Sequence, residues 1–136
     1  MRIMAVDYGD ARTGLAVSDR NGILAGEAWT VNGWDPAAVS DVIAREAAAR
    51  GVEKLVLGLP RNMDGSEGAR AQKSRDFGRL LAEKTGLEVV MWDERLTTVD
   101  AHRILSDAGR HGKKRREKID AVAATLILEG YLGSGR

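Results

Sequence analysis

The sequence predicts an α/β fold in which a mixed five-stranded sheet is flanked by helices. Three observations lead to this prediction. Three strand-like segments follow one another near the N-terminus, two further apolar segments are each preceded by a helical pattern, and two helical patterns close the chain. Under the right-handed rule for crossovers, this order gives three antiparallel strands, two parallel additions, and helices on both faces.

Apolar runs and a turn signal predict the first three strands. Ile3–Val6 and Gly14–Ser18 have the composition of strands joined by a glycine-containing turn. Asn21 and Gly22 stand between apolar runs, which is the strongest short-range signal for a hairpin. We therefore expect Ile23–Val31 to form a third strand, antiparallel to the second.

A helix and a buried strand follow. Asp35 is suited to the N-cap and Pro36 to the first helical position, and Gly51 ends the apolar helical pattern. The segment KLVLGLP, residues 54–60, is almost continuously apolar, which is typical of a central strand buried on both faces. Pro60 ends this strand because proline donates no backbone hydrogen bond.

The second half of the chain repeats the alternation and then becomes helical. A helix is predicted over Gly68–Thr85, a fifth strand within residues 87–95, and a helix capped by Thr97 that ends before Gly109. The segment RHGKKRREK, residues 110–118, is predicted as a loop, and Ile119–Leu132 as the last helix. This order of elements is that of the ribonuclease H-like fold.

Composition limits the classes of protein that fit. The 136 residues are predicted to form one domain over residues 1–136. The absence of cysteine excludes disulfides and thiolate metal sites, and is compatible with a cytoplasmic location. Neither a signal peptide nor a membrane span is indicated, so we expect no membrane partner.

Positive charge is concentrated in residues 110–118, which hold six Lys or Arg and one Glu in a chain of net charge +1. Such a cluster suits a polyanion, so Lys113, Lys114, Arg115 and Arg116 are candidate nucleic-acid contacts. We expect the segment to be mobile without substrate because its like charges repel. The alternative is a solvated loop without a binding role.

Three acidic positions are candidates for chemistry: Asp7, the pair Asp93 and Glu94, and Asp120. The carboxyl ends of parallel strands meet at one sheet edge, where Asp7 and the acidic pair are predicted to lie, and Asp120 falls in the first turn of the predicted last helix. Divalent cations, Mg²⁺ or Mn²⁺, would neutralise such a cluster and support phosphodiester cleavage. Each acid also has a structural explanation, as a turn residue, a strand end or a helix N-terminal charge.

Asp93 and Glu94 cannot both enter one metal cluster in a regular strand, because successive side chains point to opposite faces. Strand parity leaves open which of them does so, although Glu94 has the longer reach. Arg12 and Arg61 lie on predicted loops at the same edge and are candidate phosphate ligands or ordinary exposed arginines. Aromatic residues are few, so we expect recognition of the backbone and shape of a folded nucleic acid rather than base stacking.

Four segments resemble the YqgF family, also called RuvX, of Holliday junction resolvase-like proteins and ribosomal RNA precursor nucleases. They are DYGDARTGLAVSD, LVLGLPRNMDGSEG, WDERLTT and KIDAVAATLIL, in the family's order. The resemblance implies a ribonuclease H-like fold and a metal-dependent acidic site, which carries over to Asp7, Glu94 and Asp120. It also implies a cytoplasmic enzyme that matures the 5′ end of pre-16S ribosomal RNA.

Other functions remain open at the level of sequence. One is a Holliday junction resolvase acting on branched DNA, and another is a nucleic-acid-binding module without catalysis. Actin-like ATPases open with a similar Asp-x-Gly turn, but they need two such domains. Structured RNA suits a monomer or weak homodimer, whereas a two-fold junction normally needs a stable dimer.

Overall fold

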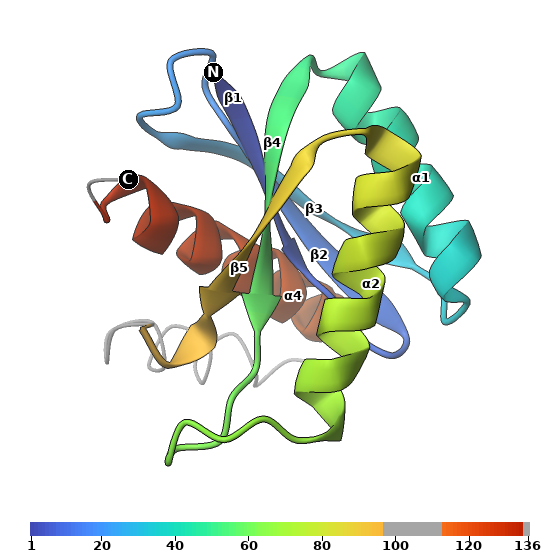
Figure 1. Cartoon of the computed structure of the whole chain (residues 1–136). Helices are drawn as coiled ribbons and strands as arrows, with labels where there is room; N and C mark the ends of the chain where they lie inside the picture. The colour runs from blue at the N-terminus through green and yellow to red at the C-terminus, as the bar shows by residue number, and fades with distance from the viewer. Residues whose placement is uncertain (97–112, 135–136) are drawn as a thin grey trace.

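The computed structural model describes residues 1–96 and 113–134, with side chains described for residues 1–96 and 121–134. Five strands form one sheet in the order β3-β2-β1-β4-β5, with β1 in the centre (Figure 1). β1 pairs antiparallel with β2 and parallel with β4, and β5 is parallel to β4. The strands are β1 (Arg2–Asp7), β2 (Arg12–Ser18), β3 (Ala25–Asn32), β4 (Val52–Leu59) and β5 (Glu88–Asp93).

Helices cover both faces of the sheet (Figure 1). Helices α1 (Pro36–Ala49) and α2 (Ala69–Thr85) pack side by side on one face, and α4 (Lys113–Leu132) crosses the other. A short 3₁₀ helix, η1 (Glu94–Leu96), follows β5 directly. This arrangement confirms the predicted mixed five-stranded sheet flanked by helices. No helix in the described ranges is long and apolar enough to cross a membrane.

Alternation along β1 divides the core into two layers. Met4 and Val6 belong to the apolar cluster beneath α1 and α2, whereas Ile3 and Ala5 belong to the cluster beneath α4. Because side chains alternate along a strand, Asp7 is on the α4 face of the sheet. The central strand thus ends in a carboxylate on the side from which α4 packs.

The predicted third strand begins two residues too early. The Asp19 carboxylate accepts hydrogen bonds from the backbone N–H groups of Ile23 and Leu24, at 2.8 and 3.2 Å. These bonds keep both residues in the turn with exposed side chains, and β3 starts at Ala25. Gly22 has a φ of 68°, as expected for a turn glycine.

The predicted start of the last helix is also wrong. Helix α4 begins at Lys113 rather than Ile119, so Lys113, Lys114, Arg115 and Arg116 lie in a helix and not in a mobile loop. Lys and Arg are good helix formers, and a charged run lacks the apolar periodicity from which a helix is recognised. The helix predicted after Thr97 and residues 110–112 lie outside the described residues.

Candidate active site

Two of the predicted acids meet at the carboxyl edge of the sheet. Asp7 is the last residue of the central strand, and Glu94 is the first residue of η1, directly after β5. The Glu94 carboxyl lies within hydrogen-bond reach of the Asp7 carboxyl. Strands β1 and β5 are not neighbours, so Glu94 reaches across the end of β4 to meet Asp7.

Gly58 makes this reach possible. It lies in β4 opposite Trp92, and the preceding Leu57 pairs with Val6, so Gly58 lies between the ends of β1 and β5. A Cβ atom at Gly58 would lie 2.6 Å from Glu94 Oε1 and 2.7 Å from Ile127 Cδ1. The space of the missing side chain is therefore filled by the Glu94 carboxylate and by α4. Sequence reasoning missed this residue, because the glycine reads as one more member of an apolar strand.

The electrostatic environment of Glu94 is unusual. Burial raises its pKa, and the opposing effects of the hydrogen bond with Asp7 and the positive charge of Arg70 do not offset this. The negative charge of Asp93 raises the pKa further. Two carboxylates this close repel each other, and a bound cation would relieve that repulsion.

The donor set of this acid pair fits a divalent cation. Carboxylate oxygens are the ligands that Mg²⁺ and Mn²⁺ prefer, and one cation would neutralise charge on both carboxylates. The structure describes no group of three acidic or histidine side chains, and the Asp120 side chain lies outside the described residues. The prediction that Asp120 falls in the first turn of the last helix is wrong, because α4 begins at Lys113 and Asp120 lies further along it. Helix α4 packs against β1 and β2.

Asp93 has a different environment from Glu94. Its neighbour Trp92 packs in the α4-side cluster, so alternation directs Asp93 to the opposite face. The carboxylate accepts from Arg95 Nη2 at 2.7 Å and from the Arg95 backbone N–H at 2.9 Å. These hydrogen bonds lower the pKa of Asp93, so this residue caps the turn that leads into η1.

The two predicted phosphate ligands, Arg12 and Arg61, lie in different parts of the fold. Arg12 is the first residue of β2. Arg61, on the loop after β4, pairs with Glu67 at 3.4 Å and with Asp93 at 3.9 Å. Sequence reasoning missed Arg70, yet it lies in the first turn of α2 and its charge acts on Glu94. The position of Arg70 at the start of a helix that follows a central strand was the sequence feature that could have identified it as a candidate.

Known proteins resemble this chain over its whole length. The family model RuvX, described as Holliday junction resolvase, matches residues 1–134. A protein of Halothermothrix orenii is 46% identical over 132 residues, which cover 97% of this chain and 94% of that protein. A protein of Myxococcus xanthus is 46% identical, with 100% of this chain and 90% of that protein covered. Both are named "Putative pre-16S rRNA nuclease".

Two solved structures share the fold at low sequence identity. Thermus thermophilus RuvC in complex with a Holliday junction aligns with a TM-score of 0.60 at 13% identity, covering 99% of this chain and 96% of that one. Fowlpox virus resolvase with its Holliday junction DNA aligns with a TM-score of 0.59 at 13% identity, covering 98% of each chain. The match to the family model and the identity to the full-length relatives show that this chain belongs to the RuvX family.

Proposed function

We propose that this protein is a divalent-metal-dependent nuclease that processes the 5′ end of pre-16S ribosomal RNA in the cytoplasm. The observation that carries the proposal is the half-buried Asp7–Glu94 pair at the carboxyl edge of the sheet, in a chain whose full-length relatives bear that name. Such a pair of acids serves no stabilising purpose by itself, since each carboxylate opposes the ionisation of the other.

Three acids, Asp7, Glu94 and Asp120, would hold the Mg²⁺ or Mn²⁺. When bound, the metal activates water and stabilises the leaving oxygen of a phosphodiester. Strand β1 fixes Asp7 because it is hydrogen-bonded on both sides, and the space above Gly58 fixes Glu94. These supports favour a preorganised acid pair.

Cationic residues around the acid pair would orient the RNA backbone. Arg12 and Arg61 are proposed phosphate ligands, and a phosphate at Arg61 would compete with Glu67 and Asp93 for its guanidinium. Lys113 through Arg116 occupy the first turn of α4, where the positive end of the helix dipole adds to their charge. The same residues would attract a structured RNA over a longer range.

The experiment is cleavage of pre-16S RNA by purified protein with Mg²⁺, with Mn²⁺ or with chelator, and mapping of the cut sites. We expect metal-dependent cleavage near the 5′ end, abolished in Glu94→Gln and retained in Asp93→Asn. Absence of cleavage together with retained RNA binding would instead support a non-catalytic binding module.

A second candidate is resolution of branched DNA, which the description of the family model favours. A resolvase must make two symmetric cuts, and that normally needs two active sites in a stable dimer. We expect a monomer or weak homodimer by sedimentation, and no symmetric cutting of a four-way junction. A stable dimer that cuts the junction symmetrically would replace RNA with DNA as the substrate.

A further inference from the structure

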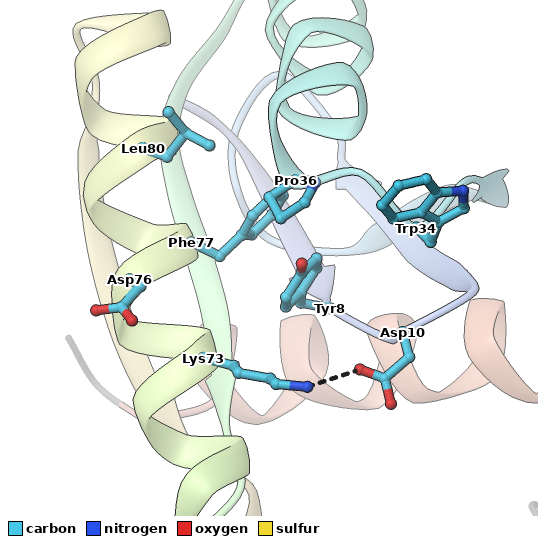
Figure 2. Close-up of a pocket in the computed structure, with 8 residues that line it drawn as sticks. All are labelled: Tyr8, Asp10, Trp34, Pro36, Lys73, Asp76, Phe77 and Leu80. Carbon is cyan, nitrogen blue, oxygen red and sulfur yellow. Dashed lines mark ion pairs between the residues drawn. The ribbon is translucent and has the colours of Figure 1, made fainter.

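A cavity of about 340 Å³ lies on the α1 and α2 face of the sheet, opposite the face on which Asp7 lies, and Figure 2 shows the residues that line it. Three segments line it: the β1–β2 turn with Tyr8 and Asp10, the start of α1 with Trp34, and α2 with Lys73 and Phe77. We call it the aromatic cleft. Its volume is at the lower end of the range for small-ligand pockets, so it suits a single heterocyclic ring system rather than a duplex.

The cleft is lined by one exposed aromatic side chain, Trp34, and one partly buried one, Tyr8. The Tyr8 ring stacks on Phe77 with centroids 3.9 Å apart and planes inclined by 7°, and Phe77 is itself buried. Tyr8 is therefore held rigidly. Trp34 is 80% exposed, although a side chain of this size gains much free energy when it is buried.

Two cations of α2 are loosely held at the same place. Lys73 Nζ lies 3.6 Å and an Arg70 Nη atom 3.8 Å from the Asp10 carboxylate, and all three side chains are about two-thirds exposed. Exposed pairs of this kind contribute little free energy, because water and salt screen them. A phosphate group can therefore take both cations from Asp10. The other acid of the cleft, Asp76, is paired with Arg79 at 3.1 Å.

The cleft and the acid pair share the end of β1 and the charge of Arg70. Tyr8 follows Asp7 directly in the chain, so the end of β1 contributes to both places. The Arg70 charge acts on Glu94 and also on Asp10. A nucleic-acid strand passing over the end of β1 meets the carboxylates on one side and the aromatic rings on the other.

We propose that the aromatic cleft binds one unpaired base of the RNA substrate, stacked on Trp34 and Tyr8, with an adjacent phosphate on Lys73 and Arg70. This proposal rests on the proposed function, because it assigns a subsite for the strand that the acid pair cleaves. Every base has a π-face, and single-stranded RNA is commonly bound by stacking on aromatic side chains. Such a subsite would add base stacking to the recognition of backbone and shape that the small number of aromatic residues led us to expect.

The test is binding of a short unstructured RNA and of an RNA duplex of equal length, both in chelator so that no cleavage occurs. Trp34→Ala is expected to weaken binding of the single strand by roughly 5- to 100-fold and to leave duplex affinity within about 2-fold. Trp34→Phe keeps an aromatic face and is expected to retain most of the affinity. Leu24→Ala is the matched control, because Leu24 is an exposed apolar residue in the turn at the other end of β2.

A second measurement uses RNAs in which single nucleotides are made abasic in turn. At one position near the cut site, the affinity decrease from the abasic nucleotide and the decrease from Trp34→Ala are expected not to add, because both remove the same stacking interaction. Full additivity at every position, or an unchanged affinity of Trp34→Ala for the single strand, would overturn the inference. A change in sedimentation of Trp34→Ala without any effect on RNA binding would also overturn it, and would assign the cleft to contact with a second copy.

These measurements separate the two proposals. Trp34-dependent binding of single strands by a protein that does not cleave RNA would refute the proposed nuclease function and support the proposed base-binding role of the aromatic cleft. Cleavage of pre-16S RNA with unchanged rate and affinity in Trp34→Ala would support the proposed nuclease function and refute the proposed base-binding role of the aromatic cleft.

Discussion

At the scale of single residues, the contrast between Asp93 and Glu94 is the most informative. The two carboxylates are adjacent in sequence, yet the pKa of Asp93 is lowered by hydrogen bonds from Arg95 and the pKa of Glu94 is raised by burial. Strand alternation and the end of β5 at Asp93 separate them. Asp93 is held by hydrogen bonds from Arg95, and Glu94 lies against a second acid.

We predict that Glu94→Gln lowers the rate of metal-dependent cleavage by at least about 100-fold, as removal of a metal-ligating carboxylate does. Its melting temperature should equal or exceed that of the wild type, because a repulsive pair of acids is relieved. Asp7→Asn and Asp120→Asn are expected to be inactive as well. Asp93→Asn should keep activity within a few-fold. An inactive Asp93→Asn beside an active Glu94→Gln would overturn the assignment.

We predict that Gly58→Ala is both destabilising and inactive. The new Cβ would overlap Glu94 Oε1 and Ile127 Cδ1, and overpacking of this kind costs about 1–3 kcal/mol. Gly78→Ala in α2 is the matched control. A Cβ atom at Gly78 would also lie close to a neighbour, 3.2 Å from Leu57 Cδ2, but alanine favours the helix in which it would stand. Chemical denaturation and cleavage rates for both variants check this, and an active Gly58→Ala would show that Glu94 does not need this space.

Asp7 and Glu94 could be placed near one edge from the sequence, because strand ends can be read from apolar runs and turn residues. The roles of both acids stay predictions. Gly58, Arg70 and Trp34 could not be recognised in the same way, since their importance depends on which strands are neighbours and which helix packs beside them. A missing side chain or an exposed ring has no pattern of its own along the chain.

At the scale of elements, the N-cap at Asp35 and the termination of α1 and α2 at Gly51 and Gly86 followed from local chemistry. The Asp35 carboxylate accepts from the Ala37 N–H at 3.3 Å, and both glycines have positive φ, 67° and 70°. The start of α4 could not be read in this way, because its first turns contain almost no apolar residue. Capping and turn signals thus predicted boundaries better than periodicity did.

We predict that replacing Lys113, Lys114, Arg115 and Arg116 by alanine weakens nucleic-acid binding and flattens its salt dependence. Removing one phosphate interaction reduces the slope of log K against log salt by about 0.9 on duplex DNA and about 0.7 on single strands. Alanine is the best helix former, so helix content by circular dichroism should be unchanged. An unchanged salt slope would mean that these residues only solvate the helix.

We predict that the β2–β3 turn loses stability in acid. Hydrogen bonds from the Ile23 and Leu24 backbone lower the pKa of Asp19, so the folded state favours its charged form. This contribution is present above the ordinary aspartate range and is lost as the pH falls below about 4 and through the lowered pKa. Melting temperatures between about pH 6 and pH 3 should fall less steeply for Asp19→Ala than for the wild type, and parallel curves would contradict this.

At the scale of the whole molecule, the order of elements was sufficient to predict the sheet. Right-handed crossovers and the buried character of β4 leave few ways to arrange three meandering strands and two helical crossovers. Nothing local predicted that Glu94 would cross the end of β4 to reach Asp7, because that contact depends on the sheet order. The extent of a single domain over residues 1–136 stays a prediction.

Asp7 and Glu94 are far apart in sequence, and this separation decides when the acid pair forms during folding. The hairpins of β1, β2 and β3 close through local contacts, whereas β4 and β5 join by non-local parallel pairing, which is slower. An incomplete chain that has formed only the meander carries Asp7 without its partner. If the acid pair is the cleavage site, as we propose, a nascent copy on the ribosome has no assembled site with which to cut the RNA around it until β5 has paired.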